Sequence, residues 1–398
     1  MTKKSDAPAI RFKGFSDAWE QRKLSELTSM HARIGWQNLR TSEFLDSGNY
    51  MLITGTDFND GAINFSTCHY VERERYEQDR NIQIHNGSIL ITKDGTLGKV
   101  AYVQGLSMPA TLNAGVFNVQ IKDANNVDEK YLFQYLKAPF LMDYVDKKAT
   151  GGTIKHLNQS ILVDFPVILP QRSEQTLIGA FFLQLDNLIT LHQRKCVFLF
   201  GLFQASISMI FTASTFSWEQ RKAKELFVST ADKGYPELPV LSATQDRGMI
   251  RRDENSINIF HDKKNEAGYK RVLPGQFVIH LRSFQGGFAH SAIEGITSPA
   301  YTVFGFSEPE KHDSEYWKYV FTSKSFIQRL ETVTYGIRDG RSISYEEFLT
   351  LGFVYPSKAE QTAIARYLDK LSDLITLHQR ELEKLQNIKK SMLEKMFV

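Results

Sequence analysis

The chain has 398 residues, of which 42% are hydrophobic and 23% charged, so it can bury apolar cores in two or three soluble domains. With 48 Lys and Arg against 45 Asp and Glu, the net charge of +3 permits a nucleic-acid partner without requiring one. The only cysteines, Cys68 and Cys196, exclude a disulfide framework and a cysteine-rich zinc site, which favours the reducing cytoplasm.

Residues 1–169 are expected to form a first mixed α/β domain. The opening "MTKKSDAPAIRF" lacks the apolar run of a signal peptide. Residues 50–65 and 87–103 alternate apolar stretches with Asn, Asp and Gly turn signals, which indicates strands. Residues 127–149 have the apolar spacing of helices.

Residues 170–212 predict a long helix that begins near Pro170. Apolar positions spaced alternately by four and three residues form a heptad seam that includes Ile189 and His192. The stretch from Cys196 to Phe211 is apolar over most of its circumference. It predicts a helix buried on more than one side, against the second domain or another subunit, rather than a membrane span.

Residues 213–355 predict a second mixed domain, with a strand–turn–strand pattern at 275–293 and a helical pattern at 314–333. Residues 356–398 predict a second long helix whose seam includes Ile375 and His378.

The two halves repeat each other. "LITLHQR" begins at Leu188 and again at Leu374, 186 positions later, and "WEQRK" begins at Trp19 and Trp218. Two copies predict a pseudo-twofold frame in which the long helices pair as an antiparallel coiled coil. In that register His192 would lie near His378. Both are interpreted as structural seam residues rather than metal ligands, because no cluster of carboxylates or cysteines surrounds either one.

Catalytic motifs are missing from the sequence. "DGTLGK" ends in Lys99, but Val100 follows where a P-loop needs Ser or Thr, and the zinc-protease, redox-cysteine, nucleophile-elbow and dinucleotide-binding patterns do not occur. We therefore expect no catalytic residue, no metal site and no cofactor in this chain.

Glycine-rich loops that carry basic and polar residues recur in both halves, and such loops let a backbone approach phosphates while side chains read bases. Ordinary solvated hairpin turns are the alternative interpretation. The candidate DNA-binding residues are Arg33, Trp36, Gln37, Lys93, Thr96, Lys99, Thr153, Lys155, Arg282, Gln285, Arg338 and Arg341.

These features resemble the specificity subunit of a type I restriction-modification system. The resemblance covers nearly the whole chain and rests on the paired "WEQRKLSEL" and "WEQRKAKEL" segments, the paired helices ending in "ITLHQR", and the lead-ins "GTIKHLNQSILVDFPVILP" and "GRSISYEEFLTLGFVYP". The apolar residues 196–211 depart from the charged pattern that family members more often have there.

The resemblance implies two target-recognition domains, 1–169 and 213–355, separated by the antiparallel spacer helices 170–212 and 356–398. Each domain would read half of a bipartite site on double-stranded DNA. The partners would be two methyltransferase subunits and restriction/translocase subunits, with S-adenosylmethionine, ATP and Mg²⁺ bound by those partners, and with no membrane. The alternatives are a fragment of a self-contained restriction-methylation enzyme, or a coiled-coil scaffold that presents two ligand-binding modules.

Overall fold

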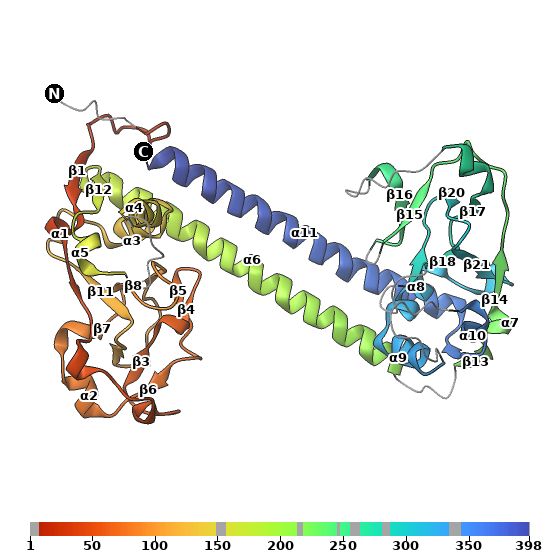
Figure 1. Cartoon of the computed structure of the whole chain (residues 1–398), viewed down its shortest axis with the longest axis horizontal. Helices are drawn as coiled ribbons and strands as arrows, with labels where there is room; N and C mark the ends of the chain where they lie inside the picture. Colours follow the sequence, from red (N-terminus) through yellow and green to blue (C-terminus); the bar gives the residue numbers. More distant parts are fainter. Residues whose placement is uncertain are drawn as a thin grey trace. The chain divides into compact units, whose positions relative to one another are not determined.

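The computed structural model describes residues 8–148, 157–212, 218–244, 247–254, 263–280, 287–333 and 344–397. The chain divides into two compact units (Figure 1). Unit 1 comprises residues 1–193 and 381–398, and unit 2 comprises residues 194–380. Both units mix helices and strands, which confirms the predicted fold class. The two long helices, α6 (Arg172–Thr212) and α11 (Lys358–Met396), each contribute residues to both units.

Unit 1 is built on two four-stranded sheets, ordered β2-β11-β8-β9 and β6-β3-β10-β7, with β1 paired to β12 and β4 to β5. Its strands are β1 (Glu20–Lys23), β2 (Thr28–His31), β3 (Met51–Ile53), β4 (Phe58–Asn59), β5 (Ala62–Ile63), β6 (His69–Tyr70), β7 (Gln83–Ile84), β8 (Ile89–Thr92), β9 (Val100–Tyr102), β10 (Ala110–Leu112), β11 (Val116–Ile121) and β12 (Pro166–Leu169). Its shorter helices are α1 (Leu24–Leu27), η1 (Gly35–Gln37), η2 (Thr41–Glu43), η3 (Gly55–Asp57), α2 (Arg73–Glu77), η4 (Arg80–Ile82), α3 (Glu129–Lys137), α4 (Phe140–Lys148) and α5 (Gln159–Leu162).

Unit 2 repeats the first of these sheets in the same order, as β14-β21-β18-β19, with β13 paired to β22, β15 to β16 and β17 to β20. Its strands are β13 (Glu219–Lys222), β14 (Phe227–Thr230), β15 (Leu241–Ala243), β16 (Met249–Arg251), β17 (Lys270–Val272), β18 (Phe277–Ile279), β19 (Phe288–His290), β20 (Gly295–Thr297), β21 (Thr302–Phe306) and β22 (Gly352–Tyr355). Its shorter helices are α7 (Ala223–Leu226), η5 (Arg252–Glu254), η6 (Lys263–Gly268), η7 (Pro309–Lys311), α8 (Ser314–Thr322), α9 (Lys324–Val333) and α10 (Tyr345–Leu349).

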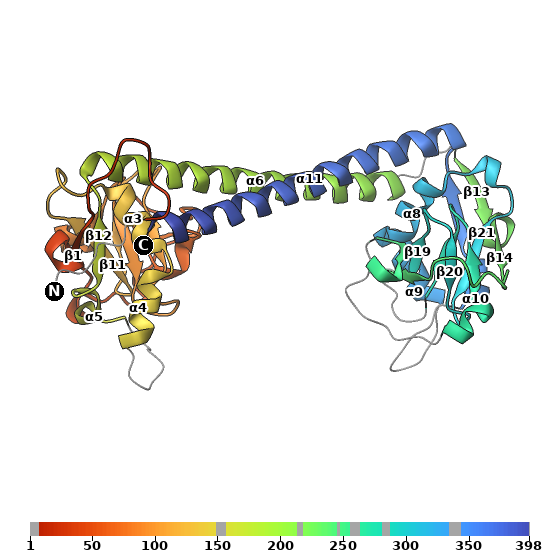
Figure 2. The same ribbon diagram turned by 90° about the horizontal axis from the view of Figure 1, so that it is seen from above.

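Each repeated sheet is covered on its apolar face by the helix that follows it in the chain. In unit 1, α3 lies against the sheet that contains β11 (Figure 2). Phe117 of β11 lies opposite Ile91 of β8, and both belong to the core that α3 closes with Phe133. In unit 2, Phe277 pairs with Phe304, and α8 closes that core with the buried Trp317. The shared strand order shows that the sequence repeat is also a repeat of structure.

A glutamine in the first turn of each long helix fastens that helix to its unit. In unit 1, Gln175 is 1% exposed, accepts a hydrogen bond from the backbone N–H of Asp128 (2.9 Å), and donates to the carbonyls of Asn126 (3.0 Å) and Pro170 (2.8 Å). Asp128 in turn caps α3. The glutamine therefore ties the start of α6 to the start of α3.

The same connection recurs in unit 2. Gln361 is 0% exposed, accepts from the backbone N–H of Asp313 (3.0 Å) and from the indole N–H of Trp317 (3.2 Å), and donates to the carbonyl of Pro356 (2.8 Å). Asp313 caps α8 as Asp128 caps α3. The repeated "EQT" at 174–176 and 360–362 thus encodes a repeated joint between helix and domain.

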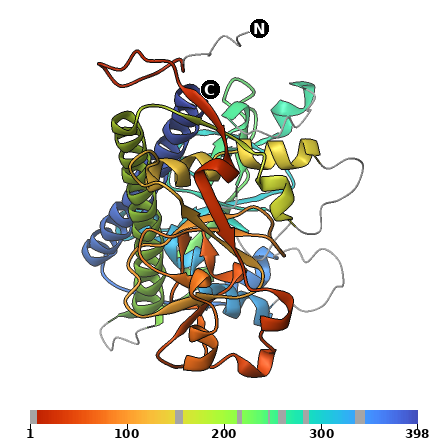
Figure 3. The same cartoon turned by 90° about the vertical axis from the view of Figure 1, so that its left-hand side faces the viewer.

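Within unit 1 the two long helices run antiparallel. Phe182 of α6 stacks on Phe397 at 5.4 Å, and further along α6 Asp186 pairs with Lys389 of α11. His192 follows, with its Nδ1 3.4 Å from Oε2 of Glu381. Partner numbers fall as α6 numbers rise, which is the predicted direction. The described N-terminal segment lies beside the end of α11 (Figure 3). Ile10 donates its N–H to the carbonyl of Lys395 (3.1 Å).

The predicted seam residues Ile189 and Ile375 are both buried, at 4% and 9% exposure. His192 belongs to unit 1 and His378 to unit 2. The proximity of these two histidines stays a prediction.

Within the chain itself, the apolar part of α6 is covered on fewer sides than predicted, and its contact with another subunit stays a prediction. The sequence predicts burial on several sides, yet Val197 is 75% exposed, Phe198 68% and Met209 72%. In this stretch Ser206 and Ile207 are buried, and Ile207 packs with Tyr319 and Leu368. The packing of this chain covers one side of the helix and leaves a wide apolar face open. By length and composition alone, α6 is also long and apolar enough to cross a membrane.

Candidate nucleic-acid interface

The turn between β8 and β9 presents three of the predicted DNA-binding residues. Thr96 and Lys99 are exposed, and Lys93 is half-buried. The turn is held from within by the buried hydroxyl of Thr92, which accepts a hydrogen bond from the N–H of Lys99 (3.0 Å) and donates to the carbonyl of Thr96. These hydrogen bonds fix the backbone of the turn from which the side chains of Thr96 and Lys99 project.

Two glycines shape this turn. Gly95 and Gly98 have φ values of +73° and +71°, in the left-handed region that favours glycine. A Cβ on Gly98 would also collide with the sulfur of Met142 in α4. The glycines predicted to let the backbone approach a phosphate are thus also required by the turn itself.

Lys93 lies where several segments of unit 1 meet. Its N–H donates to the carbonyl of Gly115 (2.8 Å), and its carbonyl accepts from the N–H of Leu157 (2.8 Å). Its ammonium lies 5.5 Å from the ring centre of Phe117. Leu157 directly follows residues 149–156, which contain the candidates Thr153 and Lys155 and lie outside the described residues.

Arg33 was predicted to contact DNA from the surface, but its side chain is buried. It is 1% exposed, and its five N–H donors all meet acceptors within unit 1. Burial lowers the pKa of its guanidinium. The acceptors are the carbonyls of Leu112 (3.0 Å), Gln37 (3.4 Å) and Arg75 (3.4 Å), Oε1 of Gln78 (3.0 Å) and Oγ1 of Thr111 (3.3 Å). No donor of Arg33 is left for a phosphate, so its side chain supports the loop instead.

Gln37 is likewise buried, at 5% exposure, and its Oε1 accepts from the N–H of Ile34 (3.3 Å). Among the side chains that the structure describes in this loop, those of Ile34, Asn38 and Arg40 are exposed. Sequence reasoning missed them, because nothing in the local pattern separates the inner from the outer side chains of an irregular loop. Trp36 lies in η1.

The remaining candidates, Thr153, Lys155, Arg282, Gln285, Arg338 and Arg341, lie outside the described residues. In unit 2 the N–H of His280 donates to the carbonyl of Gly287 (3.0 Å). Residues 281–286 connect β18 to β19, the counterparts of β8 and β9. The chain segment 281–286 therefore corresponds in the repeat to the Lys93 turn of unit 1.

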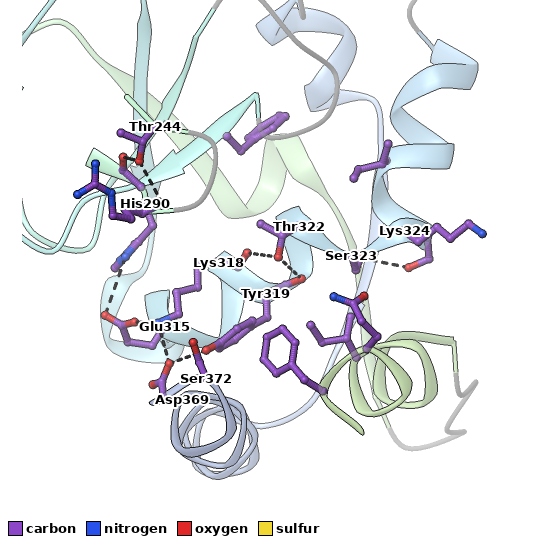
Figure 4. A pocket seen from close by; sticks show the side chains of 18 of the residues that line it. Thr244, His290, Glu315, Lys318, Tyr319, Thr322, Ser323, Lys324, Asp369 and Ser372 are labelled. Atoms are coloured by element: carbon purple, nitrogen blue, oxygen red, sulfur yellow. Dashed lines mark hydrogen bonds and ion pairs between the residues drawn. The ribbon is translucent and has the colours of Figure 1, made fainter. Parts of the chain in front are cut away.

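Unit 2 also contains a cavity of about 1480 Å³ between α8, α9 and the described parts of α6 and α11 (Figure 4). Lys318 bridges Glu315 (2.6 Å) and Asp369 (2.7 Å), and the hydroxyl of Tyr319 donates to the same Asp369 oxygen (2.7 Å). His290 lies 3.9 Å from Glu315, and burial lowers its pKa. These lining charges pair with one another, so the network fastens α8 to α11 rather than forming a reactive centre.

The sequence was compared with family models and with known proteins, and it is similar to specificity subunits of type I restriction enzymes. Residues 16–196 match the family model described as the type I restriction modification DNA specificity domain. The chain is 22% identical to the putative type I restriction enzyme MjaX specificity subunit of Methanocaldococcus jannaschii, over 94% of this chain and 92% of that protein. It is 24% identical to the MjaVIII specificity subunit of the same organism, over 79% of each.

Among solved structures, the chain resembles the S subunit of a type I restriction-modification system from M. genitalium. The TM-score is 0.64 at 14% identity, and the match covers 98% of this chain and 99% of that one. At this identity the likeness concerns the fold, and it extends over both units.

Proposed function

We propose that the chain belongs to the family of type I restriction-modification specificity subunits, and that unit 1 and unit 2 each read one part of a bipartite DNA sequence. Such a subunit selects the DNA site, while catalysis lies in other subunits of the restriction enzyme. This assignment replaces the two alternatives of an enzyme fragment and a scaffold without DNA.

One observation carries the bipartite proposal. The strand order β2-β11-β8-β9 recurs as β14-β21-β18-β19, whereas the loops on the two frames have different sequences, such as "TKDGTLGK" and "HLRSFQGG". A repeated frame presents its loops in equivalent ways, and different loops offer different donors and acceptors to base edges. Two different half-sites follow from one duplicated architecture.

In this proposal the surface of the first module includes Lys93, Thr96 and Lys99, which the turn holds at or near the solvent. Lys93 and Lys99 would neutralise phosphates, and Thr96 would donate to a phosphate or a base edge. Arg33 and Gln37 would act by shaping the neighbouring loop. Thr153, Lys155, Arg282, Gln285, Arg338 and Arg341 remain candidates on the same reasoning.

The proposed assembly contains two methyltransferase subunits and restriction/translocase subunits in the cytoplasm. S-adenosylmethionine, ATP and Mg²⁺ would bind to those partners. The paired long helices, with Ile189, His192, Ile375 and His378 along their seam, would set the distance between the half-sites. A helix of about 40 residues is about 60 Å long, comparable with the spacing of half-sites read from one face of DNA.

A domain exchange tests the bipartite proposal. Residues 20–150 are replaced by the corresponding segment of another family member, and methylated sites are sequenced in cells that also carry the partner methyltransferase. We expect one half of the recognised sequence to change and the other half to stay. The matched exchange of residues 219–333 should change the opposite half. A change of both halves in either chimera would contradict independent modules.

A further inference from the structure

The loop that follows β2 carries an isoleucine, Ile34, whose side chain is 53% exposed. Among the side chains that the structure describes in residues 8–148 and 157–169, it is the only large hydrophobic one that is exposed. A single exposed apolar side chain is common on protein surfaces and by itself indicates no function. The position of Ile34 in the fold gives it a meaning, because its loop leaves the sheet at the same end as other candidate DNA contacts.

The pairing of the strands establishes this position. β2 is antiparallel to β11, and its last residue His31 lies opposite Asn118. β8 is antiparallel to β11 on the other side, and its last residue Thr92 lies opposite Val116. β2 and β8 therefore end at the same end of the sheet, about 10 Å apart, since neighbouring strands are about 4.8 Å apart. A duplex that lies against the turn containing Lys93 also meets the loop after β2.

This loop is held from within, so the side chain of Ile34 has a defined place. The buried Arg33 donates hydrogen bonds to acceptors in β10, α2 and η1. The backbone of Ile34 is engaged as well, because its N–H donates to Oε1 of Gln37 (3.3 Å) and its carbonyl accepts from the N–H of Gln37 (2.8 Å). Ile34 therefore offers a partner only the apolar surface of its side chain.

In the major groove of DNA, the apolar group that a protein can contact is the 5-methyl group of thymine. Resting on the proposed DNA-reading role of unit 1, we propose that Ile34 contacts this methyl group and so selects an A·T pair in the half-site of unit 1. Ile34 is only half exposed, and its backbone is tied to η1. It therefore meets a base edge from the surface of the loop, whereas a wedge has to enter between base pairs.

The repeat places a different group at the corresponding position of unit 2. "HARIGW" at 31–36 corresponds to "TADKGY" at 230–235, at the same offset of 199 as the two "WEQRK" segments, so the exposed Lys233 takes the place of Ile34. An ammonium group gains nothing from a methyl group, but it donates well to O6 and N7 of guanine. The two frames thus favour different bases from equivalent positions, as two different half-sites require.

Deoxyuridine gives a sharp test, because it pairs as thymine does and lacks only the 5-methyl group. The full chain is assembled with its partner methyltransferase on the target found by sequencing methylated sites. Each thymine of the half-site assigned to unit 1 by domain exchange is replaced in turn by deoxyuridine, and dissociation constants are measured by fluorescence anisotropy. We expect one replacement to weaken binding about three- to fivefold, the effect of removing one buried methyl group.

Ile34→Ala should bind the thymine duplex as weakly as the wild type binds the deoxyuridine duplex, and it should no longer distinguish the two. Ile34→Val keeps part of the apolar contact and should keep part of the discrimination. Asn38→Ala, at an exposed position of the same loop, and Lys233→Ala, at the counterpart position, are the matched controls. Both should leave the ratio of the two dissociation constants unchanged. Circular dichroism verifies that all four variants are folded.

Three results would overturn the proposal. The first is a unit 1 half-site that contains no thymine, or one in which the wild type tolerates every deoxyuridine. The second is an Ile34→Ala variant that keeps the full discrimination. The third is an Ile34→Ala variant that weakens binding while the wild type already binds thymine and deoxyuridine duplexes alike, which would assign Ile34 to a wedge between base pairs. If unit 1 does not read DNA at all, exchanging base pairs throughout its half-site leaves binding unchanged, so the two proposals fail separately.

Discussion

Arg33 and Lys93 show how two basic residues in neighbouring loops take different roles. The guanidinium of Arg33 is enclosed, and its acceptors come from η1, α2 and β10. Lys93 keeps its ammonium at the border of the solvent, over the ring of Phe117. A buried arginine with every donor engaged stabilises a loop, whereas a half-buried lysine remains able to meet a phosphate.

Replacement of Arg33 should therefore act on stability. Arg33→Met leaves three backbone carbonyls and two side-chain oxygens without their donor. We expect the free energy of unfolding to fall by about 2–4 kcal/mol, measured by urea denaturation. Arg40→Met, at an exposed position of the same loop, should change it by less than about 0.5 kcal/mol. Unchanged stability with lost DNA affinity in Arg33→Met would instead place the guanidinium on DNA.

Replacement of the turn lysines should act on DNA binding. Lys93→Ala and Lys99→Ala remove cations proposed to neutralise phosphates, so each should weaken binding of all sequences alike. The slope of log affinity against log salt should fall by about 1 for each phosphate that a lysine no longer neutralises. Fluorescence anisotropy with specific and random duplexes measures both quantities, and Lys122→Ala, just beyond the end of β11, serves as the control. An unchanged slope in both variants would exclude this turn from the interface.

Two histidines of unit 2 predict a pH dependence of stability. Burial lowers the pKa of His290, against a partial opposing effect of Glu315, and burial also lowers the pKa of His312. The unfolded chain takes up these protons near pH 6.5, before the folded unit does. Stability is therefore full above about pH 6.5 and falls as the pH drops below it.

Hydrogen exchange of the β19 and β21 amides, measured between pH 8 and pH 5 with correction for intrinsic rates, follows the stability of unit 2. The double variant His290→Gln/His312→Phe should show a flatter dependence than the wild type. Phe suits position 312, because the imidazole stacks on Phe306 at 4.7 Å. An equally steep dependence in the variant would assign the acid sensitivity to carboxylates.

Among the elements, the long helices are bound to their units by few but repeated contacts. Gln175 and Gln361 each serve as acceptor and donor at the start of a helix, with almost no exposure. Gly179 adds a close approach in unit 1, since a Cβ there would lie 2.6 Å from the backbone nitrogen of Tyr131. Such joints fix the direction in which each helix leaves its unit.

Gln175→Ala should thus loosen the joint of unit 1. The variant removes three hydrogen bonds made by a buried side chain. The free energy of unfolding of unit 1 should therefore fall by about 2–3 kcal/mol. Gln361→Ala should do the same in unit 2. Gln184→Ala, at an exposed position of α6, is the control and should have an effect within about 0.5 kcal/mol. Equal effects of Gln175→Ala and Gln184→Ala would contradict a role for this joint.

At the scale of the whole molecule, periodicity and repetition predicted the two long helices, the two mixed units and the presence of one repeated architecture in both. They did so because heptad spacing and duplicated segments are local properties of the sequence. The position of Arg33 could not be predicted, since its acceptors lie up to 79 residues away in the chain. The exposure of Phe198 could not be predicted either, because an apolar helix pattern does not say which protein supplies the covering surface.

Unit 1 combines residues 1–193 with residues 381–398, and this affects when it can fold during synthesis. Its core contains Met396 and Phe397, which are 3% and 1% exposed, and Phe397 packs with Phe182 and Tyr135. Unit 2 is formed from one continuous stretch, residues 194–380. Domains fold as their sequences leave the ribosome, generally from the N-terminus onward. Here the unit whose translation starts first cannot complete its core until the final residues of α11 have left the ribosome.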